Sequence, residues 1–136
     1  MDLNTSMRLA LAGMTAQTQR LKIIAENLAN TDSTAKSPGG EPYRRKVVSF
    51  HTVLDKTLGA TSVAAGKPVT VVGKLDRKYD PGNPAADEQG FVQMPNVNPV
   101  VELMDMRDAQ QSYQANLNVI DAAKSMISHT LDLLRG

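Results

Sequence analysis

Residues 3–30 read LNTSMRLALAGMTAQTQRLKIIAENLAN, and the spacing of their apolar side chains sets the architecture expected for the whole chain. The spacing alternates between four and three residues, as in the seam of a coiled coil, with one glutamine among the members. The members are Leu3, Met7, Ala10, Met14, Gln17, Leu21, Ile24 and Leu28. This pattern predicts a helix roughly 40 Å long, which ends in the turn-forming sequence NTDSTAKSPGG.

The last part of the chain repeats this pattern. Steps of three and four residues connect Leu103, Met106, Gln110, Tyr113, Leu117, Ile120, Lys124, Ile127, Leu131 and Leu134. Asn98 followed by Pro99 is a favourable N-cap and first-turn pair, so the second helix is expected to begin there. Both seams are narrower than the apolar stripe of a helix on a globular core, which indicates that the two helices pack against each other.

The middle of the chain has a different composition. All seven prolines and seven of the nine glycines lie between positions 38 and 99. Residues 45–50, 68–75 and 90–94 are strand candidates, whereas the run 57–67, TLGATSVAAGK, has no periodicity and is expected to be a loop. The predicted fold is mainly α with a small β middle, in which long terminal helices pair as a coiled-coil-like antiparallel hairpin. The expected domains are a helical arm (1–37), a β/loop middle (38–98) and a second helical arm (99–136).

Composition excludes several classes of function. The chain has 136 residues, a net charge of +1 and no cysteine, so bulk charge does not favour nucleic acid. No uncharged apolar run approaches the roughly 20 residues of a membrane span, and membrane insertion is not expected. The start, MDLNTSMRLALAG, also lacks the basic and continuously apolar regions of a cleaved signal peptide.

No motif in the sequence predicts catalysis. His51 and His129 are far apart and without ligand spacing, and no nucleophile-elbow, phosphate-loop or zinc motif is present. The basic run at residues 44–46 favours a solvated or subunit-pairing charge cluster over a phosphate site. The sequence therefore predicts a protein that is not an enzyme and that uses no cofactor or metal.

Two long strings resemble a known family. GMTAQTQRLKIIAENLANTDST (13–34) is similar to the N-terminal signature of bacterial flagellar axial proteins, the rod and hook family. SYQANLNVIDAAKSM (112–126) resembles the C-terminal signature of that family. PGGEPYRRKVVSF (38–50), YDPGNPAAD (79–87), PNVNPVVELMDM (95–106) and the short middle narrow the likeness to the proximal-rod, or FlgC, type.

The resemblance implies a structural role. Members of this family stack into a hollow tube, the basal-body rod, which transmits motor torque to the hook and filament. Their terminal helices pair in the inner layer of the tube, so the expected partners are copies of this chain and other rod proteins. The residues that the resemblance assigns to the assembly interface are Gln17, Arg20, Leu21, Ile24, Asn27, Leu28, Asn30, Tyr113, Gln114, Asn116, Leu117 and Ile120.

The resemblance also implies a route of export. Relatives pass through the flagellar type III export apparatus as unfolded chains, without a cleaved leader, and reach the periplasmic rod. Early substrates of this apparatus carry a phenylalanine with an apolar residue four positions on, a pattern that Phe50 and Leu54 match. An ordinary core phenylalanine is the alternative interpretation.

Two other classes of function stay open at this stage. A soluble coiled-coil adaptor or secretion chaperone would use the same helical hairpin to hold a partner, but the Pro/Gly-rich middle disfavours it. A rod-associated peptidoglycan hydrolase would need an acid and a base or a metal, and no such pair is apparent in the sequence.

Overall fold

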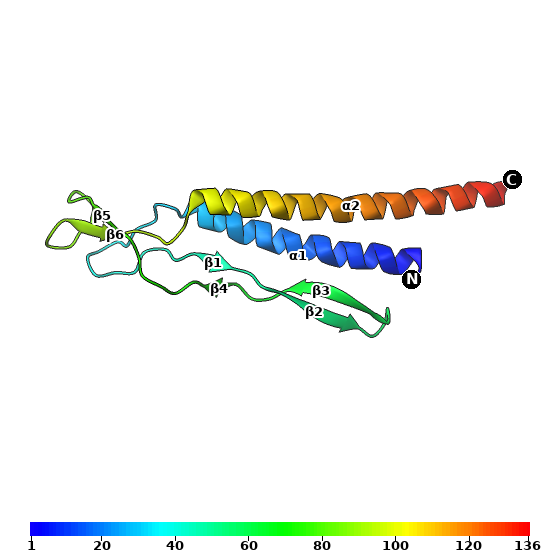
Figure 1. Cartoon of the computed structure of the whole chain (residues 1–136), viewed down its shortest axis with the longest axis horizontal. Helices are drawn as coiled ribbons and strands as arrows, with labels where there is room; N and C mark the ends of the chain where they lie inside the picture. The colour runs from blue at the N-terminus through cyan, green and yellow to red at the C-terminus, as the bar shows by residue number, and fades with distance from the viewer. The chain divides into compact units, whose positions relative to one another are not determined.

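The computed structural model describes residues 1–136, which form two long helices with short strands between them. Helix α1 spans Leu3–Ala29 and helix α2 spans Pro99–Arg135 (Figure 1). The strands are β1 (Lys46–Val47), β2 (Phe50–Asp55), β3 (Ala60–Ala65), β4 (Val69–Thr70), β5 (Arg77–Tyr79) and β6 (Phe91–Gln93). The predicted fold class is confirmed. Neither helix combines the length and the apolar character that a bilayer span requires.

Side chains cap the start of both helices. Asp2 Oδ1 accepts a hydrogen bond of 2.6 Å from the main-chain N–H of Thr5, and this bond lowers the pKa of the Asp2 carboxyl. Asn98 Oδ1 accepts a bond of 3.0 Å from the N–H of Val100. Helix α2 begins at Pro99, so the predicted start of this helix is confirmed. Proline suits this first position, because the N–H that it lacks would have no partner within the helix.

The strands form three separate antiparallel pairs, β1 with β4, β2 with β3, and β5 with β6. The strand candidates at 45–50, 68–75 and 90–94 are confirmed in shorter form by β1, β4 and β6. The loop expected at 57–67 is wrong, because residues 60–65 form β3 and pair with β2 in register from Phe50↔Ala65 to Asp55↔Ala60. The turn between these strands is held by Asp55 Oδ1, which accepts bonds from the N–H groups of Thr57 and Leu58.

The chain divides into two compact units, each assembled from segments that are distant in sequence. Unit 1 comprises residues 1–21, 48–67 and 107–136, and unit 2 comprises residues 22–47 and 68–106. These units follow spatial contacts, whereas the three expected domains, 1–37, 38–98 and 99–136, follow composition along the chain. The domain division therefore stays an expectation.

In unit 1, α1 lies between the β2–β3 hairpin and the antiparallel helix α2 (Figure 1). Small residues allow this close approach, since Ala10, Ala16, Ala109 and Ala123 are all buried. Gly13 marks the tightest contact, because a Cβ atom there would lie 2.7 Å from Nδ2 of Asn116. A side chain at position 13 would therefore push the two helices apart.

The buried residues of α2 lie one position before three members of the predicted seam, Leu103, Gln110 and Lys124. Ala109 and Ala123 are buried, whereas the predicted members Gln110 and Lys124 are exposed, and Leu103 is 56% exposed. In α1, Gly13 and Asn27 are buried, one position before the half-buried Met14 and Leu28; Ala10 and Ile24 are buried as predicted. At Gly13, Ala109 and Ala123 the reason is steric, because closely approaching helices need small side chains on the line between them, and a pattern of large apolar residues misses that line.

In unit 2, the β5–β6 pair has its own small core. Val92 is almost completely buried, and the rings of Tyr79 and Phe91 meet edge to face with centroids 5.4 Å apart. Asp87 shapes the adjacent turn, because its Oδ1 accepts bonds of 2.9 Å from the N–H groups of Gln89 and Phe91. The bond from Phe91 is the main reason why the pKa of Asp87 lies below its ordinary value.

Candidate assembly interface

The residues of the N-terminal motif differ in how far they are available to another chain. Ile24 and Asn27 are buried within unit 2, and the others, Gln17, Arg20, Leu21, Leu28 and Asn30, are half-buried. The Oε1 atom of Gln17 is buried with no hydrogen-bond partner. Asn30 closes the end of α1, since its Nδ2 donates to the carbonyl of Glu26 and its Oδ1 accepts from the hydroxyl of Ser33.

Asn27 is the centre of a buried polar network in unit 2. Its side chain is 1% exposed and makes four hydrogen bonds. Nδ2 donates to the carbonyl of Lys46 at 2.8 Å and to Oε2 of Glu102 at 3.1 Å. Oδ1 accepts from the hydroxyl of Tyr43 at 2.8 Å and from the N–H of Lys46 at 2.9 Å. In this fold the amide is fully used inside its own unit.

Glu102 is the second member of the network and is also 1% exposed. Its Oε1 accepts a hydrogen bond from Nε of Arg45, and Nη2 of that arginine lies 3.2 Å from Oδ2 of Asp105. The backbone of Arg45 is fixed as well, because its N–H donates to Oδ1 of Asn96 at 2.7 Å and its carbonyl accepts from the N–H of Val71 at 2.8 Å. The buried carboxylate is thus both hydrogen-bonded and charge-paired, as burial of a charge requires.

Two titratable groups at the edge of the network have shifted pKa values. Burial raises the pKa of the Tyr43 phenol, and the charge of Glu26 raises it further. The carboxylate of Glu26 also accepts a hydrogen bond from Nζ of Lys46, which raises the pKa of that ammonium group. The two pKa shifts favour the neutral phenol of Tyr43 and the charged ammonium group of Lys46.

The residues of the C-terminal motif lie on one stretch of α2 in unit 1. Tyr113, Asn116, Leu117 and Ile120 are half-buried, whereas Gln114 is exposed and donates to Oδ1 of Asn118 at 3.0 Å. Leu117 and Ile120 face α1 across an apolar groove of about 390 Å³. The other residues that line this groove are Asn4, Met7, Arg8, Leu11 and Lys124.

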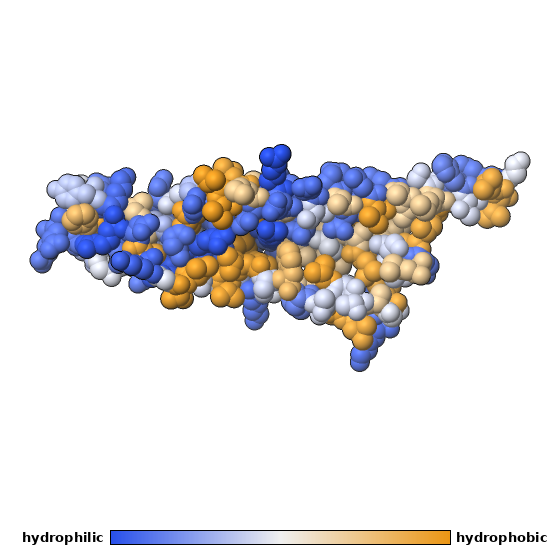
Figure 2. All heavy atoms as spheres, in the orientation of Figure 1, coloured by the Kyte–Doolittle hydropathy of each residue, from blue (hydrophilic) through white to orange (hydrophobic).

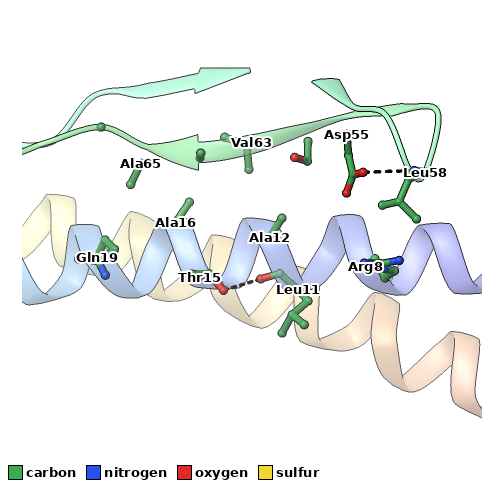
Figure 3. A pocket seen from close by; sticks show the side chains of 13 residues that line it. Arg8, Leu11, Ala12, Thr15, Ala16, Gln19, Asp55, Leu58, Val63 and Ala65 are labelled. Carbon is green, nitrogen blue, oxygen red and sulfur yellow. Dashed lines mark hydrogen bonds between the residues drawn. The ribbon is translucent and has the colours of Figure 1, made fainter. Parts of the chain in front are cut away.

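A second groove in unit 1 runs between α1 and the β2–β3 hairpin and has a volume of about 550 Å³. Figure 3 shows Ala12 and Ala16 of α1 facing Val63 and Ala65 of β3 across this groove. Thr15 does not line it with a free hydroxyl, because its Oγ1 donates to the carbonyl of Leu11 at 2.9 Å. The groove is lined mainly by small side chains, so its floor is close to the backbone.

The proposed export pair lies on β2. Phe50 is 38% exposed and Leu54 is 62% exposed, and they stand opposite Ala65 and Thr61 of β3. The alternative interpretation of Phe50 as an ordinary core residue is wrong, because the residues of β2 are exposed from Phe50 to Leu54.

Two clusters of exposed apolar residues on α2 lie outside the assembly interface that the sequence predicts. Figure 2 shows them as orange patches over the first turns of α2 and over its C-terminal end. The first cluster consists of Val100, Val101, Leu103 and Met104. The second, which we call the C-terminal patch, consists of Met126, Ile127, Leu131, Leu133 and Leu134. A sequence signal existed, because the predicted apolar seam of the second helix already included Leu103, Ile127, Leu131 and Leu134.

Comparison with known proteins identifies the family. A family model described as flagella basal body rod protein matches residues 7–35, and one described as flagellar basal body rod FlgEFG protein C-terminal matches residues 88–133. The FlgC flagellar basal-body rod protein of Agrobacterium fabrum is 45% identical over 133 residues, which cover 98% of this chain and 96% of that protein.

More distant relatives carry the same description. The FlgC protein of Escherichia coli O6:H1 is 42% identical over 92% of both chains, and that of Bacillus subtilis is 35% identical over 94% of this chain and 95% of its own length. The likeness to rod proteins thus extends over nearly the whole length, which favours the rod interpretation over an adaptor, a chaperone or a hydrolase. The chain therefore belongs to the family of FlgC flagellar basal-body rod proteins.

Proposed function

We propose that this chain is a structural subunit of the proximal rod of the flagellar basal body, which assembles with copies of itself and with other rod proteins into the hollow drive shaft. The observation that carries the proposal is the C-terminal patch. Leu133 and Leu134 are 83% and 80% exposed near the end of α2, in a stretch where every residue after Ala123 is exposed. Exposed apolar side chains gathered in this way are typical of a surface that another protein covers.

A drive shaft needs contacts that propagate. A patch that binds a different surface of the next copy produces an open helical filament when the rotation does not close. The side chains of the C-terminal patch are exposed in the single chain. The apolar groove between α1 and α2 in unit 1 is a different surface, which the patch of a neighbouring copy could contact. Such heterologous contacts along long helices would distribute torque over many side chains.

Within this proposal, the assembly residues have different roles. Gln114 is exposed and can contact a neighbour directly, whereas the half-buried Tyr113, Leu117 and Ile120 present only part of their surface. Gln17, Arg20, Leu21, Leu28, Asn30 and Asn116 belong to the same partly accessible class. Ile24 and Asn27 act indirectly, because they hold the end of α1 in the shape that neighbouring subunits meet.

The proposal includes export through the flagellar type III apparatus and a final location in the periplasmic rod. Phe50 and Leu54 would be read in the unfolded chain, before β2 pairs with β3. The fold tolerates this use, because neither side chain is a core residue that the folded unit needs. The absence of disulfides also suits a chain that travels unfolded.

Leu117→Asp tests the proposal, because it places a charge in the apolar groove between α1 and α2. We expect the variant to be exported, but rods to be missing from isolated basal bodies and swimming to be lost, since the change removes apolar contacts of Leu117 and assembly would have to desolvate a carboxylate in the groove. Export is measured by immunoblot of the secreted fraction, and swimming in soft agar.

Asn118→Asp is the matched control, because it adds the same charge at the neighbouring, exposed position. We expect this control to swim like the parent. Unaltered swimming of Leu117→Asp would contradict the proposed role of the helices.

A further inference from the structure

The packed face of α2 repeats itself along the helix. Ala109, Asn116 and Ala123 stand seven residues apart, and so do Met106, Tyr113 and Ile120. A slide of α2 against α1 by one heptad, about 10 Å along the axis, would replace each of these side chains by one at the equivalent heptad position. Small residues such as Ala109 and Ala123 fit either register. Apolar packing alone therefore discriminates weakly between the two registers.

The network of unit 2 does not repeat. Asn27 at the end of α1 and Glu102 at the start of α2 are each 1% exposed and share a hydrogen bond of 3.1 Å. One heptad further along α2 the position of Glu102 is taken by Ala109, which can neither accept from Asn27 nor pair with Arg45. A slide would leave the amide and the guanidinium without their carboxylate, at a high desolvation cost.

The third member of the network is fixed from outside the helices. The main chain of Arg45 is bonded to Asn96 and Val71, so its side chain reaches Glu102 from a constrained position. The same segment contributes both main-chain groups of Lys46 to Asn27. Asn27 and Arg45 thus each donate a hydrogen bond to one oxygen of Glu102, and together they define where a carboxylate of α2 can bind.

We propose that Asn27, Glu102 and Arg45 form a register key, which selects one alignment of α2 against α1. The Glu102–Arg45 pair acts through specificity rather than through added stability. Removal of both charges by apolar residues of similar size relieves the desolvation cost of the pair, and such replacements in buried ion pairs often leave stability unchanged. In coiled coils, a single buried polar residue is known to fix the register of the helices at a cost in stability.

Pulsed electron–electron distance measurement on the full chain tests the key. Because the chain has no cysteine, Ala25→Cys and Leu103→Cys introduce two specific nitroxide sites, both exposed, on α1 and α2 of unit 2. The labelled parent is expected to give one narrow distance. In the background Glu102→Leu with Arg45→Met, we expect a second distance population, while the thermal midpoint stays within about 5 °C of the parent.

The matched control removes an exposed ion pair of the same unit. Glu41 and Arg44 lie 3.0 Å apart, Glu41 is 73% exposed, and the control Glu41→Leu with Arg44→Met leaves the net charge equally unchanged. This control is expected to keep one narrow distance. The proposal is overturned by one unchanged distance in the folded Glu102→Leu/Arg45→Met chain, by unfolding of that chain at room temperature, or by a second distance in the control.

Discussion

Asn27→Ala is expected to lower the free energy of unfolding by about 3–5 kcal/mol. Alanine removes the partner of the Tyr43 hydroxyl, of both main-chain groups of Lys46 and of one oxygen of Glu102. Since Glu102 is 1% exposed, water cannot replace the lost bond without opening the unit. The cost is therefore that of several buried or partly buried polar groups left unpaired, and not of one contact.

Urea unfolding followed by circular dichroism measures this loss. Asn118→Ala is the control, because Asn118 is exposed on α2 and its side chain accepts only from Gln114. We expect the control to lie within about 0.5 kcal/mol of the parent, as for most exposed positions. A loss of less than about 1 kcal/mol for Asn27→Ala would show that the four hydrogen bonds of Asn27 are not formed together in solution.

Leu131→Ser with Leu134→Ser is expected to abolish rod assembly and swimming while the folded chain stays as stable as the parent within about 1 kcal/mol. Leu131 is 52% exposed and Leu134 is 80% exposed, so their removal takes little packing from the chain itself. If neighbouring subunits cover the C-terminal patch, the same removal takes apolar surface from every contact along the shaft, and each buried leucine contributes about 1.5–3 kcal/mol.

The readouts are the unfolding curve of the purified chain, the presence of rods in isolated basal bodies, and spread in soft agar. His129→Ala with Asp132→Ala is the control on the same turns, because it changes exposed polar residues and leaves the C-terminal patch intact. We expect the control to swim. Normal swimming of the Leu131→Ser/Leu134→Ser strain would exclude this patch from assembly.

The terminal helices could be predicted because their signals are local. Seven-residue periodicity, the Asn98 and Pro99 start and the turn-rich sequence after residue 30 each act within a few residues, so α1 and α2 begin and end close to where expected. The exact packed line could not be predicted in the same way. It runs through Gly13, Ala109 and Ala123, whose importance comes from the absence of a large side chain.

The hairpin and the network depend on contacts that are distant in sequence. Strand β3 consists of small residues without alternation, and it becomes a strand because it pairs with β2 and lies beside α1. Asn27 and Glu102 are separated by 75 positions, so no local pattern joins them. The resemblance to rod proteins drew attention to Asn27, but as an assembly residue; its four bonds inside the unit are visible only in three dimensions.

The measurement that tests the account most directly is removal of this chain from the cell that makes it, with rod formation and swimming as readouts. We predict that the deletion strain builds no complete rod and does not swim, and that the parent chain restores both when supplied in trans, because a shaft cannot continue past a missing proximal subunit. A deletion strain that still assembles rods and swims would contradict the account.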